Sequence, residues 1–467
     1  MSISNFDDDN EVGLMNIGLI FSIIAFLVAL FSFIFRTMWN KVDSKALALI
    51  LRNLRSGPPI LRECGGFFAL VQYDEMRSSE ESEKSADEES SKKSNPFRQN
   101  SKRNLKMKKI RETKYQHPWL LTTLKGHIAQ VLDIDFSLNG NRGAVEFDNA
   151  THIVFAPDSV SILVSLCMAN KLFVYKVTRK KEGCQGYKIV PVDNVEYPVK
   201  HKSDIKNIGV ASTGKFVMSS DENAIALYSL RGDLFKILEP KLNFLHTVII
   251  SPCGRFLAAG GFTPDAIIYE VLFDRKGNFQ DAKRVFDLKG HHSGIYAIAF
   301  NKSSSKCVTA SKDGTWNLYN IDIRYSLGED AKIIASGTWD LLKNAAPDTV
   351  HLAISPSGNS FVISASRHLK FFCALNPQKN FDIVLDIHQE PVTKVCISAC
   401  GKLVATSGDR HMRIFHNVAE YYAVVLSLEK AVDQARAGAV KRDFEEELAN
   451  SRKLLESIMK GEHKQSM

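Results

Sequence analysis

The chain has 467 residues and a formal net charge of +8, and 45% of its residues are hydrophobic. This apolar content is ordinary for a folded protein, so a large core is possible. The eight cysteines form no CxxC pair and no paired framework, which excludes a disulfide scaffold and gives no support to a zinc site. Unpatterned cysteines in a chain of this size are typical of a reducing compartment.

An uncharged apolar run occupies residues 12–35. As a helix it would extend about 36 Å, enough to cross a hydrocarbon core about 30 Å thick. A cleaved signal peptide is the alternative, but the run is long and the residues before it are acidic, whereas signal peptides begin with basic residues. We therefore expect residues 12–35 to form a transmembrane anchor.

Basic residues follow this run and none precedes it. The positive-inside rule then places everything after the anchor in the cytosol. The basic residues nearest the run are Arg36, Lys41, Lys45, Arg52 and Arg55.

The juxtamembrane segment, residues 36–73, contains a short helical pattern that ends at Gly57-Pro58-Pro59. Leu47, Ile50, Leu51 and Leu54 have the spacing of a single helix face. This helix could lie on anionic lipid or dock onto the folded domain, and the sequence leaves both open. Residues 60–73 are mostly apolar and carry no recognisable motif.

Residues 74–114 form a charged linker, first rich in Glu and Ser and then rich in Lys and Arg. Such a composition cannot bury enough apolar surface to fold alone, so we expect disorder. Its basic half could neutralise the phosphates of RNA or lipid, or be a solvated spacer. The candidate phosphate contacts are Lys106, Lys108, Lys109 and Arg111.

Residues 115–418 repeat one plan: an apolar strand, a tight turn, a strand ending in small residues, a polar turn, and a strand ending in an aromatic residue. Equivalent turn glycines, Gly358 and Gly401, are 43 residues apart, which matches the blade period of a β-propeller. Ringed sheets of this kind bury one another's faces. Six copies begin at Ile153, Ile208, Val248, Ile298, Leu352 and Val395, and a weaker seventh begins at Val131. We therefore expect an all-β, seven-bladed propeller.

The two ends of the repeat array differ from its middle. The last copy shows three strands, and His117 to Leu124 precedes the first copy as a spare strand, so we expect it to close the ring as the fourth strand of the last blade. The first copy lacks a strand pair after Gly143, so either the first blade is incomplete or the chain is an unusual isoform.

The repeats resemble the WD40 family. Leu288-Lys289-Gly290-His291, followed by Ser311, Asp313 and Tyr319, stands where that family has its His, Ser/Thr, Asp and Trp network. The resemblance implies that these four side chains, beginning with His291, hold a blade together rather than catalyse a reaction. The terminal Trp-Asp of the family is replaced here, as by Phe415-His416, so we expect weaker networks.

Longer stretches, such as ISPCGRFLAAGGFTPD at residues 250–265 and SGDRHMRIFHN at residues 407–417, are similar to a WD40 branch with the same anchor, basic linker and C-terminal helix. This resemblance implies a single-pass protein of the endoplasmic reticulum membrane whose propeller faces the cytosol. It also implies two kinds of protein partner: the kinase of the unfolded protein response, and the translation machinery, meaning translation factors or the ribosome.

Residues 419–460 contain no Gly or Pro except Gly438, and an apolar stripe runs along them. The spacing predicts one amphipathic C-terminal helix. It could form a short coiled coil or pack on the propeller.

The sequence contains no P-loop, HExxH, GxSxG or kinase signature. We therefore expect a scaffold for protein partners and not an enzyme, with no cofactor, no metal and no small-molecule substrate. One alternative is an adaptor that binds RNA through the linker or lipid through basic blade loops such as Arg179-Lys180-Lys181. A propeller hydrolase would need Asp, Glu or His side chains converging in the central channel, and no such cluster is recognisable in the sequence.

Overall fold

The computed structural model describes residues 66–71, 115–125, 130–137, 150–166, 170–179, 187–192, 194–339, 349–435 and 438–462, with single positions between some of them. The chain divides into two compact units after Ser56, and every described residue belongs to the second unit.

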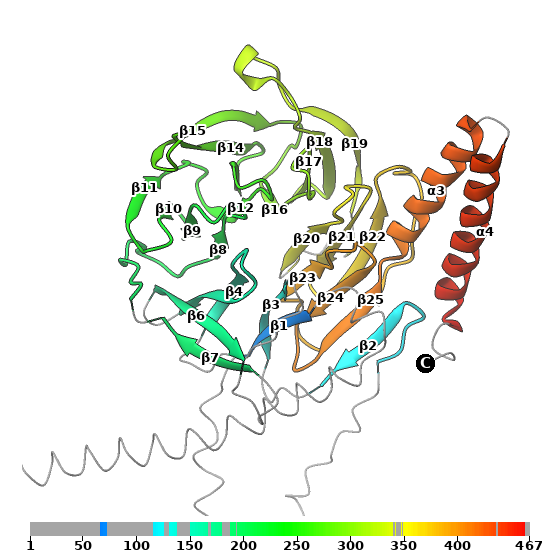
Figure 1. The fold of residues 1–467 in the computed structure, drawn as a ribbon, viewed down its shortest axis with the longest axis horizontal. Helices are drawn as coiled ribbons and strands as arrows, with labels where there is room; N and C mark the ends of the chain where they lie inside the picture. Colours follow the sequence, from blue (N-terminus) through cyan, green and yellow to red (C-terminus); the bar gives the residue numbers. More distant parts are fainter. Residues whose placement is uncertain are drawn as a thin grey trace, which may run out of the picture. The chain divides into compact units, whose positions relative to one another are not determined.

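Most described residues form antiparallel sheets of consecutive strands (Figure 1). Three four-stranded sheets come first in the chain: β4 Ala150–Phe155, β5 Ser161–Leu166, β6 Lys171–Arg179 and β7 Tyr187–Pro191; β8 Asn207–Val210, β9 Val217–Ser220, β10 Ile225–Tyr228 and β11 Leu234–Leu238; β12 Leu245–Ile250, β13 Phe256–Gly261, β14 Ala266–Phe273 and β15 Phe279–Leu288.

Three further sheets complete the series. They contain β16 Ile295–Phe300, β17 Lys306–Ser311, β18 Thr315–Asn320 and β19 Lys332–Thr338, with the 3-10 helix η2 Tyr325–Leu327 before β19; β20 Val350–Ile354, β21 Ser360–Ala365 and β22 His368–Cys373; and β23 Lys394–Ile397, β24 Leu403–Ser407 and β25 Met412–His416, with β2 Leu120–Leu124 as fourth strand.

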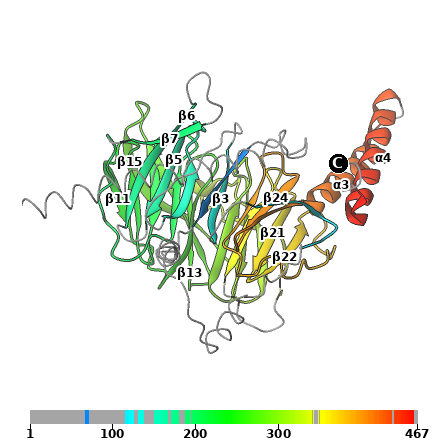
Figure 2. The same ribbon diagram turned by 90° about the horizontal axis from the view of Figure 1, so that it is seen from below.

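These sheets form a β-propeller. The first strands β4, β8, β12, β16, β20 and β23 contact one another in this order, and β3 Val131–Ser137 contacts both β23 and β4, which closes the ring. Figure 1 shows the sheets arranged radially around a centre, and Figure 2 shows the same sheets from the side. The cores lie between neighbouring sheets, as where Trp316 of β18 packs against Phe361 of β21 with ring centroids 4.8 Å apart.

The prediction of seven blades is wrong. The described strands form six blades of three or four strands, and the remaining sheet contains two strands, β1 Gly66–Val71 and β3. The physical reason is the short distance from β3 to β4, residues 138–149, which leaves too little chain for the strand pair of a blade. The partner of β3 comes instead from residues 66–71, where the sequence carries no motif.

The prediction that residues 117–124 supply the fourth strand of the last blade is confirmed. β2 pairs with β25, with Leu124 opposite Met412. The N–H of His416 also donates to the carbonyl of Trp119, at 2.9 Å. The last blade is therefore built from both ends of the repeat array.

The prediction of one C-terminal helix is also corrected. Two helices, α3 Val418–Gln434 and α4 Ala439–Lys460, pack against each other, and α3 contacts β21 and β22 (Figure 1). The break lies at Gly438, whose φ of +153° is a conformation that other residues rarely adopt. Asn417 caps α3 by accepting a hydrogen bond from the N–H of Glu420.

The expected single-pass membrane architecture is withdrawn. In the part of the chain that the structure describes, no helix is long and apolar enough to cross a bilayer. The expected anchor, residues 12–35, lies outside the described residues, as do residues 36–65 and the linker 74–114. The family resemblance implied a location in the endoplasmic reticulum membrane for a single-pass protein with its propeller facing the cytosol, and this location is withdrawn with the single-pass architecture.

Candidate functional site

Three blades contain the same buried network. A histidine before the first strand of the blade pairs with an aspartate from the turn between its second and third strands. The histidine–aspartate distances are 3.3 Å for His201 and Asp221, 3.5 Å for His291 and Asp313, and 3.1 Å for His388 and Asp409. Each histidine also bonds a hydroxyl on the second strand: Ser219 at 2.6 Å, Thr309 at 2.6 Å and Thr406 at 2.9 Å.

Each aspartate ties two loops together. Asp313 accepts from the N–H of His292, at 2.8 Å, and from the N–H of Thr315 in its own turn, also at 2.8 Å. In the other two networks the residue after the histidine likewise donates its N–H, from Lys202 to Asp221 and from Gln389 to Asp409. The network therefore fixes the entry loop of a blade against its central turn.

The other two residues of the sequence prediction lie in the same blade as His291. The hydroxyl of Ser311 donates to the carbonyl of Gly294, at 3.0 Å, and the hydroxyl of Tyr319 donates to the carbonyl of Lys289, at 3.0 Å. Tyr319 is fully buried and is the third-strand aromatic of the blade. That these four side chains stabilise the blade stays a prediction.

The electrostatics of the networks follow from burial. Burial lowers the pKa of His201, His291 and His388, and the partner aspartates only partly oppose this effect. Burial alone would raise the pKa of Asp313, but hydrogen bonds from the His292 N–H and from Thr315 outweigh it and lower the pKa. At pH 7 we therefore expect neutral histidines beside ionised aspartates.

The networks mark one end of the propeller, which we call the network end. Because blade strands alternate in direction, this end holds the starts of first and third strands and the ends of second and fourth strands. Five aromatic residues also occur at these positions, near the blades β12–β15 and β16–β19. We call them the aromatic ladder, and they are Phe244, His246, Phe262, Tyr296 and Trp339.

The ladder is continuous from ring to ring. His246 lies 4.6 Å from Phe262 and 5.5 Å from Tyr296, measured between ring centroids, and Tyr296 lies 6.5 Å from Trp339. Trp339 is buried and donates from Nε1 to the carbonyl of Ser311, at 3.0 Å, which anchors the ladder to the predicted network. Half of the surface of Phe262 is exposed. A large apolar ring held in place on a solvent-facing surface suits contact with a protein partner.

Sequence reasoning missed the ladder, because its members come from four segments between residues 244 and 339. The available signal was the GFTPD stretch at residues 261–265, which is more specific than the generic repeat and contains Phe262.

A polar cluster lies on the inner strands. Lys394 of β23 pairs with Asp133 of β3 at 3.2 Å, and His351 of β20 bonds the carbonyl of Val392 at 3.0 Å. Burial lowers the pKa of His351 and of His152, on β4, to about 4, despite the opposing charge of Asp133. Sequence reasoning found no such cluster, because four strands far apart in the chain contribute to it.

We assign no catalytic role to this inner cluster. Asp133 already accepts from the N–H of Ile153, at 2.9 Å, in addition to pairing with Lys394, so its oxygens are engaged in holding strands together. Among the described residues, no group of His, Cys, Asp or Glu side chains is arranged to hold a metal ion. The hydrolase alternative therefore gains no support from the residues that the structure describes.

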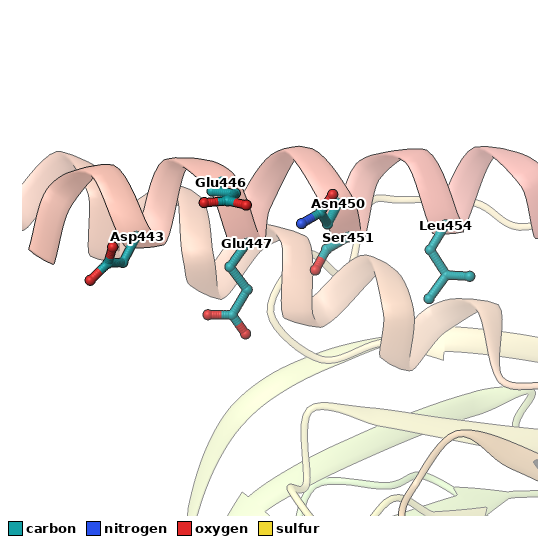
Figure 3. A pocket seen from close by; sticks show the side chains of 6 residues that line it. All are labelled: Asp443, Glu446, Glu447, Asn450, Ser451 and Leu454. Atoms are coloured by element: carbon teal, nitrogen blue, oxygen red, sulfur yellow. The ribbon is translucent and has the colours of Figure 1, made fainter. Parts of the chain in front are cut away.

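Two other places were candidates for binding. A hollow on α4 is lined by side chains of one helix face (Figure 3); the lining residues are Asp443, Glu446, Glu447, Asn450, Ser451 and Leu454. It is an open acidic surface without a buried polar group to select a ligand. The predicted phosphate contacts Lys106, Lys108, Lys109 and Arg111 lie outside the described residues, as do Lys180 and Lys181.

Comparison with known proteins adds the evolutionary context. The WD domain, G-beta repeat family matches residues 282–320 and 380–416, which include two of the three networks. Transducin beta-like protein 2 of Mus musculus is 30% identical over 396 residues, which cover 79% of this chain and 88% of that protein. The Homo sapiens protein of the same name is 29% identical, over 76% of this chain and 84% of its own length. Actin-interacting protein 1 of Drosophila melanogaster is 25% identical over 39% of this chain and 28% of its own length.

Proposed function

Because this chain belongs to the WD40 family, and within it to the family of transducin beta-like protein 2, we propose that it is a scaffold that holds protein partners on the network end of its propeller. The observation that carries the proposal is the aromatic ladder. Phe262 is half exposed, yet its ring lies against His246 and Phe244.

Rigid aromatic side chains supply most of the binding energy at many protein interfaces, because they bury a large area at little cost in conformational entropy. Phe262 meets this description. It is positioned by the N–H of its own backbone, which donates to the carbonyls of Leu242 and Phe244, both at 3.2 Å. The loop that carries Phe262 is thus bonded to the entry loop of its blade, and a partner would meet a surface that is already ordered.

The partners in this proposal are those that the family resemblance implies: the kinase of the unfolded protein response, and translation factors or the ribosome. No enzymatic step is assigned to the chain. The basic linker supports a second candidate, an adaptor for RNA, because ten Lys and Arg residues between Lys92 and Lys114 accompany one acid, Glu112.

The experiment compares single variants of the full chain in binding to purified probes: the catalytic domain of the unfolded-protein-response kinase and purified ribosomal subunits. Phe262→Ala should weaken the binding of at least one probe tenfold or more, since interface hot spots contribute about 2 kcal/mol or more. Leu327→Ala is the matched control: this residue is 73% exposed but follows the end of β18, at the opposite end of the propeller. If both variants bind as the unchanged chain does, the network end is not the docking surface.

A further inference from the structure

One strand of the ring is supplied from a distant part of the chain. In the six blades, the sheet partner of each first strand is the next strand in sequence, as β5 is for β4 and β24 is for β23. The partner of β3 is β1, and residues 72–130 separate the two strands in the sequence. β1 runs antiparallel to β3, with Gly66 opposite Ser137 and Ala69 opposite Ile134.

β3 is fixed in the ring by bonds that do not involve β1. On the side of β23, the hydroxyl of Thr393 donates to the carbonyl of Val131, at 2.7 Å, and Lys394 pairs with Asp133. On the side of β4, the carboxylates of Asp133 and Asp135 accept from the N–H groups of Ile153 and Phe155, at 2.9 and 3.0 Å.

Further contacts hold the same strand. The N–H of Val131 donates to the carbonyl of Asp409, at 3.1 Å, and the thiol of Cys396 donates to the carbonyl of Ile134, at 3.2 Å. Side chains and loops of both neighbouring blades thus position β3. None of these contacts involves β1.

Fewer strand pairings hold β1 in place. Among the described strands, β1 pairs with β3 alone, whereas the second strand of each blade pairs on both edges. A strand bonded along one edge is less costly to remove, and a tethered segment rebinds at an effective concentration on the order of millimolar. The second strand of a blade differs on both counts, because it is bonded along two edges and a short turn joins it to its first strand.

We propose that the outer edge of β3 is a strand-acceptor site, and that β1 is its resident but exchangeable occupant. The ligand class is a short extended segment without charges that adds antiparallel to β3, as residues 66–71 (GFFALV) do. Backbone hydrogen bonds along an exposed strand edge give such strand addition its affinity. This site is independent of the aromatic ladder and of the partners proposed above.

The register is tested first, by disulfide formation in the full chain. Cysteines at Gly66 and Ser137, introduced as G66C and S137C, should cross-link on mild oxidation, because these positions are opposite each other. The matched control is L70C with S137C, which places the cysteines four residues out of register, about 13 Å apart. Peptide mapping distinguishes this bond from bonds to native cysteines, which include Cys64, two residues before Gly66, and the exposed Cys253 and Cys400 of the described residues. Absence of the G66C–S137C bond would overturn the proposal.

Exchange is tested with a peptide. A variant with residues 66–71 replaced by Gly-Ser repeats should bind a synthetic peptide of residues 65–73 at one to one. The intact chain should bind it at least tenfold more weakly, since β1 competes. The same peptide with both A69P and L70P should not bind the variant. Successive N–H groups of a strand face opposite edges, so one of the two prolines removes an N–H that pairing with β3 needs. A folded variant that does not bind the peptide, or equal binding by variant and intact chain, would contradict exchange.

A second measurement does not require the variant to fold without β1. Chains carrying G66C alone are mixed with chains carrying S137C alone, both with β1 intact. An exchangeable β1 should produce disulfides between chains that increase with protein concentration. Pairing that forms within the double-cysteine chain but never between the mixed chains would show that β1 is a permanent part of the ring.

Discussion

At the scale of single residues, a buried histidine connects two loops of its blade in each of the three networks. His291 bonds Thr309 on one side and pairs with Asp313 on the other, so its ring spans from the entry loop to the central turn. Removing a buried side chain of this kind leaves its partners without a hydrogen bond, which costs more than the net free energy of the bond itself.

His291→Ala should therefore lower the free energy of unfolding by about 1–3 kcal/mol. Urea denaturation followed by circular dichroism measures this change. The neighbouring exposed histidine gives a matched control, and His292→Ala should change stability by less than about 0.5 kcal/mol. Equal effects of the two substitutions would show that the network does not stabilise the blade.

The inner histidines predict how stability depends on pH. Burial lowers the pKa of His152 and His351 to about 4, while both return to about 6.5 in the unfolded chain. Between these values the unfolded state binds more protons. Stability should therefore fall as the pH drops from about 6.5 to about 4, by up to about 1.4 kcal/mol per pH unit for each histidine.

The charged and titratable groups that face both histidines are Asp133 and Lys394; Lys206 also acts on His152, and His152 acts on His351. The network histidines His201, His291 and His388 shift in the same direction. All five histidines thus contribute to the slope of unfolding free energy against pH. His351→Asn should remove the contribution of one of them. Unfolding free energies at pH 7, 6, 5 and 4 measure the slope, with His292→Asn as the control. An unchanged slope in His351→Asn would refute the assignment.

The sequence predicted the residues of some sites and missed those of others. The motif around His291 pointed to the histidine and to Asp313 of one network, because the spacing from the entry glycine to the turn aspartate is local to one blade. It named Ser311 as the hydroxyl residue, whereas the hydroxyl that His291 bonds is that of Thr309. The same approach could have found His201 and His388, since each lies 18 residues before its hydroxyl partner, as His291 does. The pairing of Asp133 with Lys394 could not be read this way, because ring closure alone brings them together.

At the scale of elements, the last blade depends on a strand from the other end of the repeats. Trp119, just before β2, is 3% exposed, and its ring packs edge-on against Phe371 at 5.4 Å. Trp119→Ala should destabilise the protein by about 3–5 kcal/mol, because it leaves a large cavity beside the strand that closes the ring.

Thermal unfolding followed by circular dichroism measures this effect, and Thr123→Ala on the partly exposed face of β2 is the control. Replacing residues 117–124 by a Gly-Ser segment of equal length should go further, exposing the edge of β25 and promoting aggregation. A replaced chain with an unchanged melting temperature would mean that β2 does not close the ring.

The sequence predicted most elements but not all of their partners. The six blade copies were visible because each has a repeated turn. Two elements escaped prediction for opposite reasons. β1 lies among apolar residues with no repeat signal, and its pairing with β3 is long-range. The break between α3 and α4 lies at Gly438, a residue visible in the sequence, but one glycine in a helical pattern does not by itself decide between a kink and a turn.

At the scale of the whole molecule, two regions are candidate binding surfaces for partners: the network end and the basic linker. If the linker binds RNA, affinity should fall steeply with salt, because released counterions dominate the binding free energy. Changing Lys106, Lys108, Lys109 and Arg111 to alanine should weaken binding of a 20-nucleotide single-stranded RNA. It should also reduce the slope of log affinity against log salt by about 3, at about 0.7 per phosphate contact.

Fluorescence anisotropy at several salt concentrations measures both quantities. Changing the three lysines to arginine, with Arg111 unchanged, keeps the charge and should keep the slope. Affinity that survives the alanine changes and high salt would reject the linker as an RNA site.

The central claim is that protein partners dock on the network end, and amide hydrogen exchange of the full chain with and without the unfolded-protein-response kinase domain tests it most directly. The account predicts slower exchange on complex formation in residues 242–246, 261–265 and 292–296, the three segments that carry or adjoin the exposed part of the aromatic ladder. Protection confined to residues 92–114, with unchanged exchange in those three segments of a bound complex, would contradict it.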